Sequence, residues 1–182
     1  MPRINPITAK SDLPAEHHAA ADAVVKVFGS IPGPFTMLLH SPVLAERLLS
    51  LVTFYRDECI IGAKLRSVAI LTAVREREAE YVWAAQVAHA RRNGVREEVI
   101  DLLREKGDPG KLSAEEREIV IYTRQLLRTN RVDPATFAAL KNRYGAQWMV
   151  ELTAAINFFG IVAGVANAFE VQAPPDGDKL PK

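Results

Sequence analysis

The sequence contains a single cysteine and no excess of charge of either sign. One cysteine, Cys59, excludes an intramolecular disulfide framework and any redox pair of cysteines within one chain. Because Cys59 stands beside Ile60 and Ile61, the sequence favours a buried, unreactive thiol over a reactive one. The 23 basic and 22 acidic residues nearly cancel and are interspersed along the predicted helices. We therefore expect no nucleic-acid partner and no binding to an anionic membrane.

Metal ligands and phosphate-binding loops are also lacking. None of the four histidines has a carboxylate partner at the spacing of a metal site, although a site shared between subunits stays open. No glycine-rich phosphate loop and no serine nucleophile motif are present. We expect neither a metal nor an organic cofactor.

Targeting and membrane-spanning segments are not predicted. The N-terminus lacks the apolar stretch of a signal peptide. The most apolar segment, residues 149–169, contains Glu151, Asn157 and Asn167, which suits a buried core helix better than a membrane span. The sequence therefore predicts a soluble cytoplasmic protein.

Apolar residues recur every three or four positions, and no alternating strand pattern is present, which predicts an all-α fold. Residues 31–42 are expected to form an irregular lead-in with a short helical turn, because prolines and glycine interrupt them. We expect one domain, with an N-terminal helix and lead-in over residues 1–32, a core over 33–171 and a flexible polar tail over 172–182. The predicted helices cover about 14–29, 42–55, 64–74, 76–93, 95–106, 114–127, 134–144 and 146–170. Ser11 or Asp12 is expected to cap the first of them, Pro42 and Pro134 to open two others, and Ser113 with Glu116 to form a capping box.

Three segments, in order, resemble the carboxymuconolactone decarboxylase and alkyl hydroperoxidase D superfamily. They are GPFTMLLHSPVLAERL from residue 33, LRSVAILTAVREREAEYVWAAQVAHAR from residue 65 and ELTAAINFFGIVAGVANAFEV from residue 151. The resemblance covers residues 33–171. It implies an AhpD-like helical bundle that assembles into a trimer or hexamer and acts on a small molecule.

The positions that carry the chemistry of the hydroperoxidase branch are replaced here. The resemblance places a cysteine pair at Ala79 and Val82, a histidine at Gln86 and a glutamate near Ser67. Alanine and valine supply no thiol, and glutamine does not titrate near neutral pH. A thiol peroxidase is therefore excluded at these positions.

The decarboxylase branch does without the cysteine pair and uses polar and histidine side chains in the same cavity. The resemblance thus implies a cofactor-independent lyase or isomerase of a small organic acid or lactone, in the catabolism of aromatic compounds. His89 is spaced three residues from Gln86, so it shares the helix face of Ala79 and Val82. We predict His89 as a general acid–base; the alternative is a histidine at a helix flank or a subunit contact.

His40 is the second candidate acid–base, because Pro42 fixes the chain next to it. The alternative is a histidine that caps a helix or packs. Gln86 and Tyr81 are predicted to orient the substrate. The alternative for Gln86 is a glutamine packed against a neighbouring subunit. The alternative for Tyr81 is an aromatic residue of the core or of an interface.

Ser67, Arg66 and Trp83 are the candidate substrate-binding residues, with Arg66 or Arg75 opposite a substrate carboxylate. The alternative for these arginines is exposure on the surface. The second class of function is a non-catalytic or ligand-binding homologue that keeps the bundle without the relay. The two classes differ in one structural expectation. An enzyme should bring His89 and His40 to a common polar pocket, whereas a binding or structural protein need not.

Overall fold

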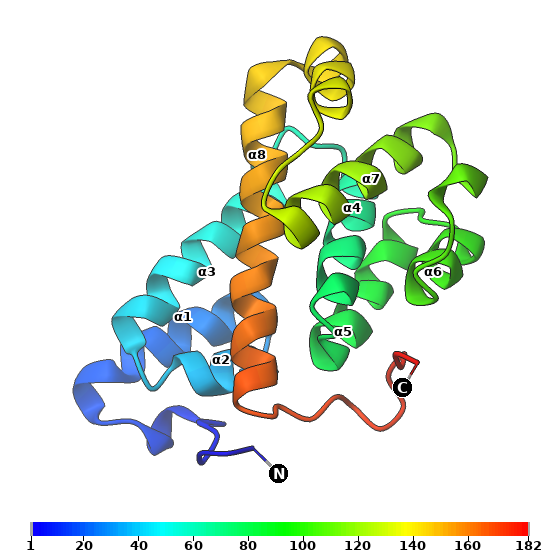
Figure 1. The fold of residues 1–182 in the computed structure, drawn as a ribbon. Coiled ribbons are helices and arrows are strands. Elements are labelled where there is room, and N and C mark those ends of the chain that lie inside the picture. Colours follow the sequence, from blue (N-terminus) through cyan, green and yellow to red (C-terminus); the bar gives the residue numbers. More distant parts are fainter. Residues whose placement is uncertain (1, 182) are drawn as a thin grey trace.

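The computed structural model describes residues 2–181, which form helices and short 3-10 turns and contain no β-strand (Figure 1). This confirms the all-α prediction. The α-helices are α1 (His18–Phe28), α2 (Gly33–Leu38), α3 (Pro42–Asp57), α4 (Ala63–Glu76), α5 (Glu80–Arg92), α6 (Glu97–Arg104), α7 (Ala114–Thr129) and α8 (Pro134–Ala168). The 3-10 turns are η1 (Lys10–Asp12), η2 (Ala15–His17) and η3 (Pro109–Lys111).

Two helices organise the bundle. α4 packs against α5, α6, α7 and α8, and every residue from Ser67 to Arg75 is buried. α8 runs through the middle of the molecule, with α1–α3 on one side and α4–α7 on the other (Figure 1). One apolar cluster, to which Ala155 and Phe158 of α8 contribute, holds α1–α3. The other cluster holds α4–α7 and includes Ile156 and Ala163, so α8 joins the two parts.

α8 is also long and apolar enough to cross a membrane by length and composition, and it is the helix among residues 2–181 that meets this test. Half of its most apolar window is buried inside the fold. α8 contacts α2, α4, α5 and α7. The buried half of α8 thus packs as the core helix of the bundle.

Local sequence signals set most helix ends. Pro42 and Pro134 occupy the first position of their helices, where the missing N–H costs nothing. Ser113 and Glu116 form the predicted capping box of α7. α8 bends at Gly145, whose φ of 85° and ψ of 173° suit glycine, so the two helices predicted over 134–144 and 146–170 form one kinked helix.

The start of the first helix was predicted wrongly. Ser11 or Asp12 was expected to cap a helix after Pro14, but α1 begins at His18. The Asp12 carboxylate instead accepts hydrogen bonds from the backbone N–H of Thr8 and Ala9, at 2.8 and 3.0 Å. Asp12 therefore stabilises the turn over residues 8–12 instead of capping α1. Residues 33–38, expected to be mostly irregular, form α2, because five apolar or small side chains in a row become buried there.

The boundary between α4 and α5 also differs from the prediction. A helix was expected to start at Glu76, but α4 continues through Glu76 and α5 starts at Glu80. Glu78 adopts a left-handed conformation with φ of 51°. Arg75 and Lys106 both form ion pairs with its carboxylate and hold the turn. Ala79 consequently precedes α5 as its N-cap residue.

Candidate functional site

The positions at which the resemblance expects a thiol relay lie in the apolar core. Ala79 and Val82 are buried among the residues of the cluster around α4. Ser67 is buried as well, and its Oγ accepts a hydrogen bond of 2.9 Å from Nδ2 of Asn93. Gln86 is half-buried on α5. Three of the four positions are therefore packed in the interior, and none of the four carries a charge.

The two candidate histidines lie on the surface, each with its own partner. His89, near the end of α5, is exposed, and Nη2 of Arg92 donates to its Nδ1 at 2.8 Å. Loss of hydration on the ring side that faces the protein, followed by the positive charge of Arg92, lowers the pKa of His89 below its ordinary value. His40 is exposed after α2, and its Nε2 lies 2.9 Å from the carbonyl oxygen of Asn5. The two histidines thus bond to different partners, and neither is among the residues that line the apolar hollow beside α8.

The remaining candidate residues are engaged in contacts within the fold. The hydroxyl of Tyr81 accepts a hydrogen bond of 2.7 Å from the backbone N–H of Gly33. Nη1 of Arg66 donates to the carbonyl oxygen of Ile61 at 2.7 Å. Trp83 is fully buried, and its Nε1 has no acceptor among the described residues. Their roles toward a substrate stay predictions.

Cys59 is half-buried between α3 and α4. Burial raises the pKa of its thiol, and the neighbouring carboxylate of Glu151 adds to the effect. That carboxylate is fixed by hydrogen bonds of 2.9 Å from the backbone N–H of Ile60 and from Nε2 of Gln147. A thiol that stays protonated at neutral pH is a poor nucleophile, which agrees with the expected unreactive cysteine.

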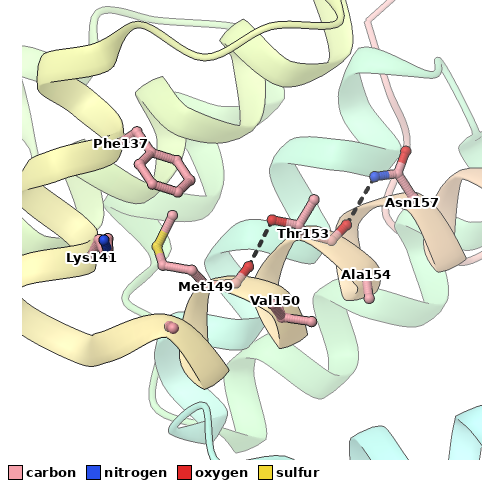
Figure 2. Close-up of a pocket in the computed structure, with 8 residues that line it drawn as sticks. Phe137, Lys141, Met149, Val150, Thr153, Ala154 and Asn157 are labelled. Carbon is pink, nitrogen blue, oxygen red and sulfur yellow. Dashed lines mark hydrogen bonds between the residues drawn. The ribbon is translucent and has the colours of Figure 1, made fainter.

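A shallow apolar hollow of about 430 Å³ lies beside α8, on both sides of the kink at Gly145 (Figure 2). Thr153 Oγ1 donates to Met149 O at 2.7 Å and lies 2.6 Å from the hydroxyl of Tyr122 in α7, and Asn157 Nδ2 donates to Thr153 O at 2.9 Å. Lys141 adds one charged side chain to the lining. The sequence analysis did not predict this surface. The available signal was the scarcity of charge, because Glu151 is the one charged residue among residues 146–168. The hollow is lined by Phe137, Lys141, Ala146, Met149, Val150, Thr153, Ala154 and Asn157.

Comparison of the whole fold with solved structures gives two close likenesses. An uncharacterized peroxidase-related protein from Ralstonia eutropha JMP134, described as an alkylhydroperoxidase AhpD core, matches with a TM-score of 0.75 and 17% identity, over 94% of this chain and 92% of that one. The fold is AhpD-like. A variant of the debrominase Bmp8, solved in complex with 2,3,4-tribromopyrrole, matches the same AhpD-like arrangement with a TM-score of 0.71 and 20% identity, over 96% of this chain and 95% of the other.

No protein-family model and no curated protein sequence matches this chain. The AhpD-like fold expected from the resemblance is confirmed by the structural matches. At such low identity the likeness concerns the fold, and the chemistry has to be argued from the residues of this chain.

Proposed function

We propose that this protein is a non-catalytic, ligand-binding protein of AhpD-like fold that lacks a thiol relay. The burial of Ala79 and Val82 in a continuous apolar core is the observation that carries this proposal. No thiol, carboxylate or histidine stands at the relay positions. His40 and His89 bond to different partners, the carbonyl oxygen of Asn5 and the guanidinium of Arg92. A soluble protein of the cytoplasm fits this role, as the composition predicts.

A cofactor-independent lyase or isomerase is the second candidate, and the state of His89 favours it. Because Arg92 donates to Nδ1, that nitrogen carries no proton, and the lowered pKa keeps the ring neutral at pH 7. A neutral imidazole is the form that a general base requires. The guanidinium of Arg92 would attract a substrate carboxylate to the same place.

One set of assays separates the two candidates. The purified protein is incubated with hydroperoxide and a dithiol, and separately with a panel of lactone carboxylates. We expect neither peroxide consumption nor release of carbon dioxide above the buffer rate. Carbon dioxide release that disappears in His89→Ala and persists in His17→Ala would instead establish the lyase. Peroxide turnover that survives Cys59→Ser would contradict both candidates.

We further propose that copies of this chain associate through one face of α8, in keeping with the oligomer that the resemblance implies. This neutral face consists of the exposed residues Ala146, Gln147, Val150, Ala154, Asn157, Ile161, Gly164, Asn167 and Ala168. None is charged, and Val150 and Ile161 are 67% and 50% exposed. In a two-fold contact the same face of each copy meets its counterpart, so a face without charge avoids like-charge repulsion. The apolar hollow can also receive Val150 of the second copy. A hexamer contains such two-fold contacts.

Glutamate on the neutral face is expected to dissociate this assembly. Val150→Glu and Ile161→Glu would each bury a carboxylate in an apolar contact, which should weaken association by about a hundredfold. The mass in solution is measured by light scattering over a range of concentrations. Val43→Glu, at a residue of α3 that is 65% exposed, is the matched control and should leave the mass unchanged. Equal masses for the wild type and both α8 variants would exclude this interface.

A further inference from the structure

After α8 the chain runs back toward α5 (Figure 1), and Asp178 bonds there to one arginine of α5 and one of α6. Residues 172–181, called the tail below, contain no helix. Asp178 fixes the tail to two arginines, Arg91 of α5 and Arg104 of α6. The sequence predicts a flexible tail, and its flexibility stays a prediction. The contacts nonetheless give the tail a defined place on the protein.

The two arginines hold both oxygens of the Asp178 carboxylate. Nη1 of Arg91 lies 2.5 Å from Oδ2, Nη2 of Arg91 lies 3.3 Å from Oδ1, and Nη2 of Arg104 donates to Oδ1 at 2.9 Å. The side chains of Asp178 and Arg104 are only 23% and 21% exposed, so these bonds are partly shielded from water. Charge-assisted, forked bonds of this kind are the strongest that arginine makes with a carboxylate.

Contacts outside the tail also hold Arg91 and Arg104 in place. Arg91 is also paired with Glu97, at 2.7 and 3.0 Å, and Arg104 with Asp101. The guanidinium of Arg104 further lies 5.9 Å from the centre of the Trp83 ring. The two guanidinium groups, called the cradle below, are therefore pre-organised to receive a carboxylate, which reduces the cost of binding one.

Apolar contacts accompany the carboxylate. Leu180, two residues after Asp178, packs against the core cluster around α4. At Gly177 the tail comes so close to α5 that an added Cβ would stand 3.0 Å from Cβ of Ala84. The tail thus presents one carboxylate and one apolar side chain to neighbouring places on α5 and α6.

We propose that the cradle is a binding site for a small carboxylate joined to an apolar group, and that the tail occupies this site as an internal competitor. Asp178 takes the place of the ligand's carboxylate, and Leu180 takes the place of its apolar part. This inference rests on the proposed binding role, to which it adds a class of ligand and a means of regulation. Trp83, fully buried beside Arg104, places a reporter next to the site.

Benzoate is the probe, with uncharged benzamide as its control, and binding to the full-length chain is measured by calorimetry. Asp178→Asn removes the carboxylate that competes for the cradle, so benzoate should bind about tenfold more tightly than to the wild type. A tenfold gain in affinity corresponds to the loss of roughly one charge-assisted hydrogen bond from the tail. Asp176→Asn is the matched control, because this exposed neighbour forms no ion pair within residues 2–181, and it should bind benzoate as the wild type does. Adding Arg104→Gln to Asp178→Asn should abolish the binding.

Two outcomes would overturn the proposal. The first is equal benzoate affinity in Asp178→Asn and Asp176→Asn. The second is benzoate binding that persists after Arg104→Gln, which would place the ligand elsewhere. Backbone amide shifts of Gly177 and Lys179 report the tail itself and should move in Asp178→Asn and on adding benzoate to the wild type. Catalytic turnover in the assays above would refute the proposed function and leave these binding results standing.

Discussion

Gly33→Ala is expected to lower the free energy of unfolding by about 2–3 kcal/mol, as expected for overpacking of a filled core. A Cβ at this position would stand 2.3 Å from Cζ of Tyr81 and 2.8 Å from Cγ1 of Val171. The Tyr81 ring cannot retreat freely, because its hydroxyl accepts the hydrogen bond from the Gly33 N–H. Movement of the ring would break this bond and leave a backbone donor unpaired.

Urea unfolding followed by circular dichroism measures this loss. Gly62→Ala is the control, because an added Cβ at Gly62 meets no atom within 4 Å, and it should change stability by less than about 0.5 kcal/mol. In a Tyr81→Ala background the same Gly33→Ala change should cost much less, since the clashing ring is gone. Equal losses for Gly33→Ala in both backgrounds would refute the steric explanation.

Glu116→Gln is the second change with a large expected effect, a loss of about 2–3 kcal/mol at pH 7. The Glu116 carboxylate is 1% exposed and closes the capping box by accepting from the backbone N–H of Ser113 at 3.2 Å, and it also accepts from Oγ of Ser113 at 2.8 Å. Nζ of Lys64 lies 3.0 Å from it and Nη2 of Arg96 lies 3.3 Å from it. Glu116 therefore ties the start of α7 to α4 and to the residue before α6.

This loss should depend on pH. Burial alone would raise the pKa of Glu116, but the hydrogen bonds from Lys64 and Ser113 outweigh burial and bring the pKa below its ordinary value. A carboxylate with a lowered pKa contributes its full stability above the unfolded pKa of about 4.5 and loses it as the pH falls through the folded value. The difference in the free energy of unfolding between the wild type and Glu116→Gln should thus be largest near pH 7 and should shrink as the pH falls below 4.5. Exposed Glu98→Gln should track the wild type throughout.

Local chemistry explains what the sequence predicted well. Pro42, Pro134 and the pair Ser113–Glu116 act within their own helix turns, so their positions could be read without knowledge of the packing. The lack of sulfur at Ala79 and Val82 likewise follows from residue identities alone, and the exclusion of a thiol peroxidase built on it stays a prediction. The resemblance in three ordered segments supplied the AhpD-like fold, which the periodicity of apolar residues could not specify.

Contacts between distant residues explain what the sequence missed. The turn at Glu78 depends on Lys106, 28 residues away, and a glutamate gives no local signal for a left-handed conformation. The helix face that His89 shares with Gln86 was predicted, but the exposure of His89 depends on how α5 packs. Asp178 meets Arg91 across 87 positions, so a polar, proline-rich tail looked unattached.

The burial of Ala79 and Val82 has a consequence for engineering. Two cysteine substitutions at these positions would place both thiols where neither solvent nor a hydroperoxide reaches them. An apolar surrounding also raises the pKa of a thiol, so the reactive thiolate would be scarce even if the side chains fitted. Installing peroxidase chemistry would require an access channel and a nearby base in addition to sulfur. The packed core around Ala79 and Val82 therefore opposes such an engineered activity, and two cysteine substitutions alone do not supply it.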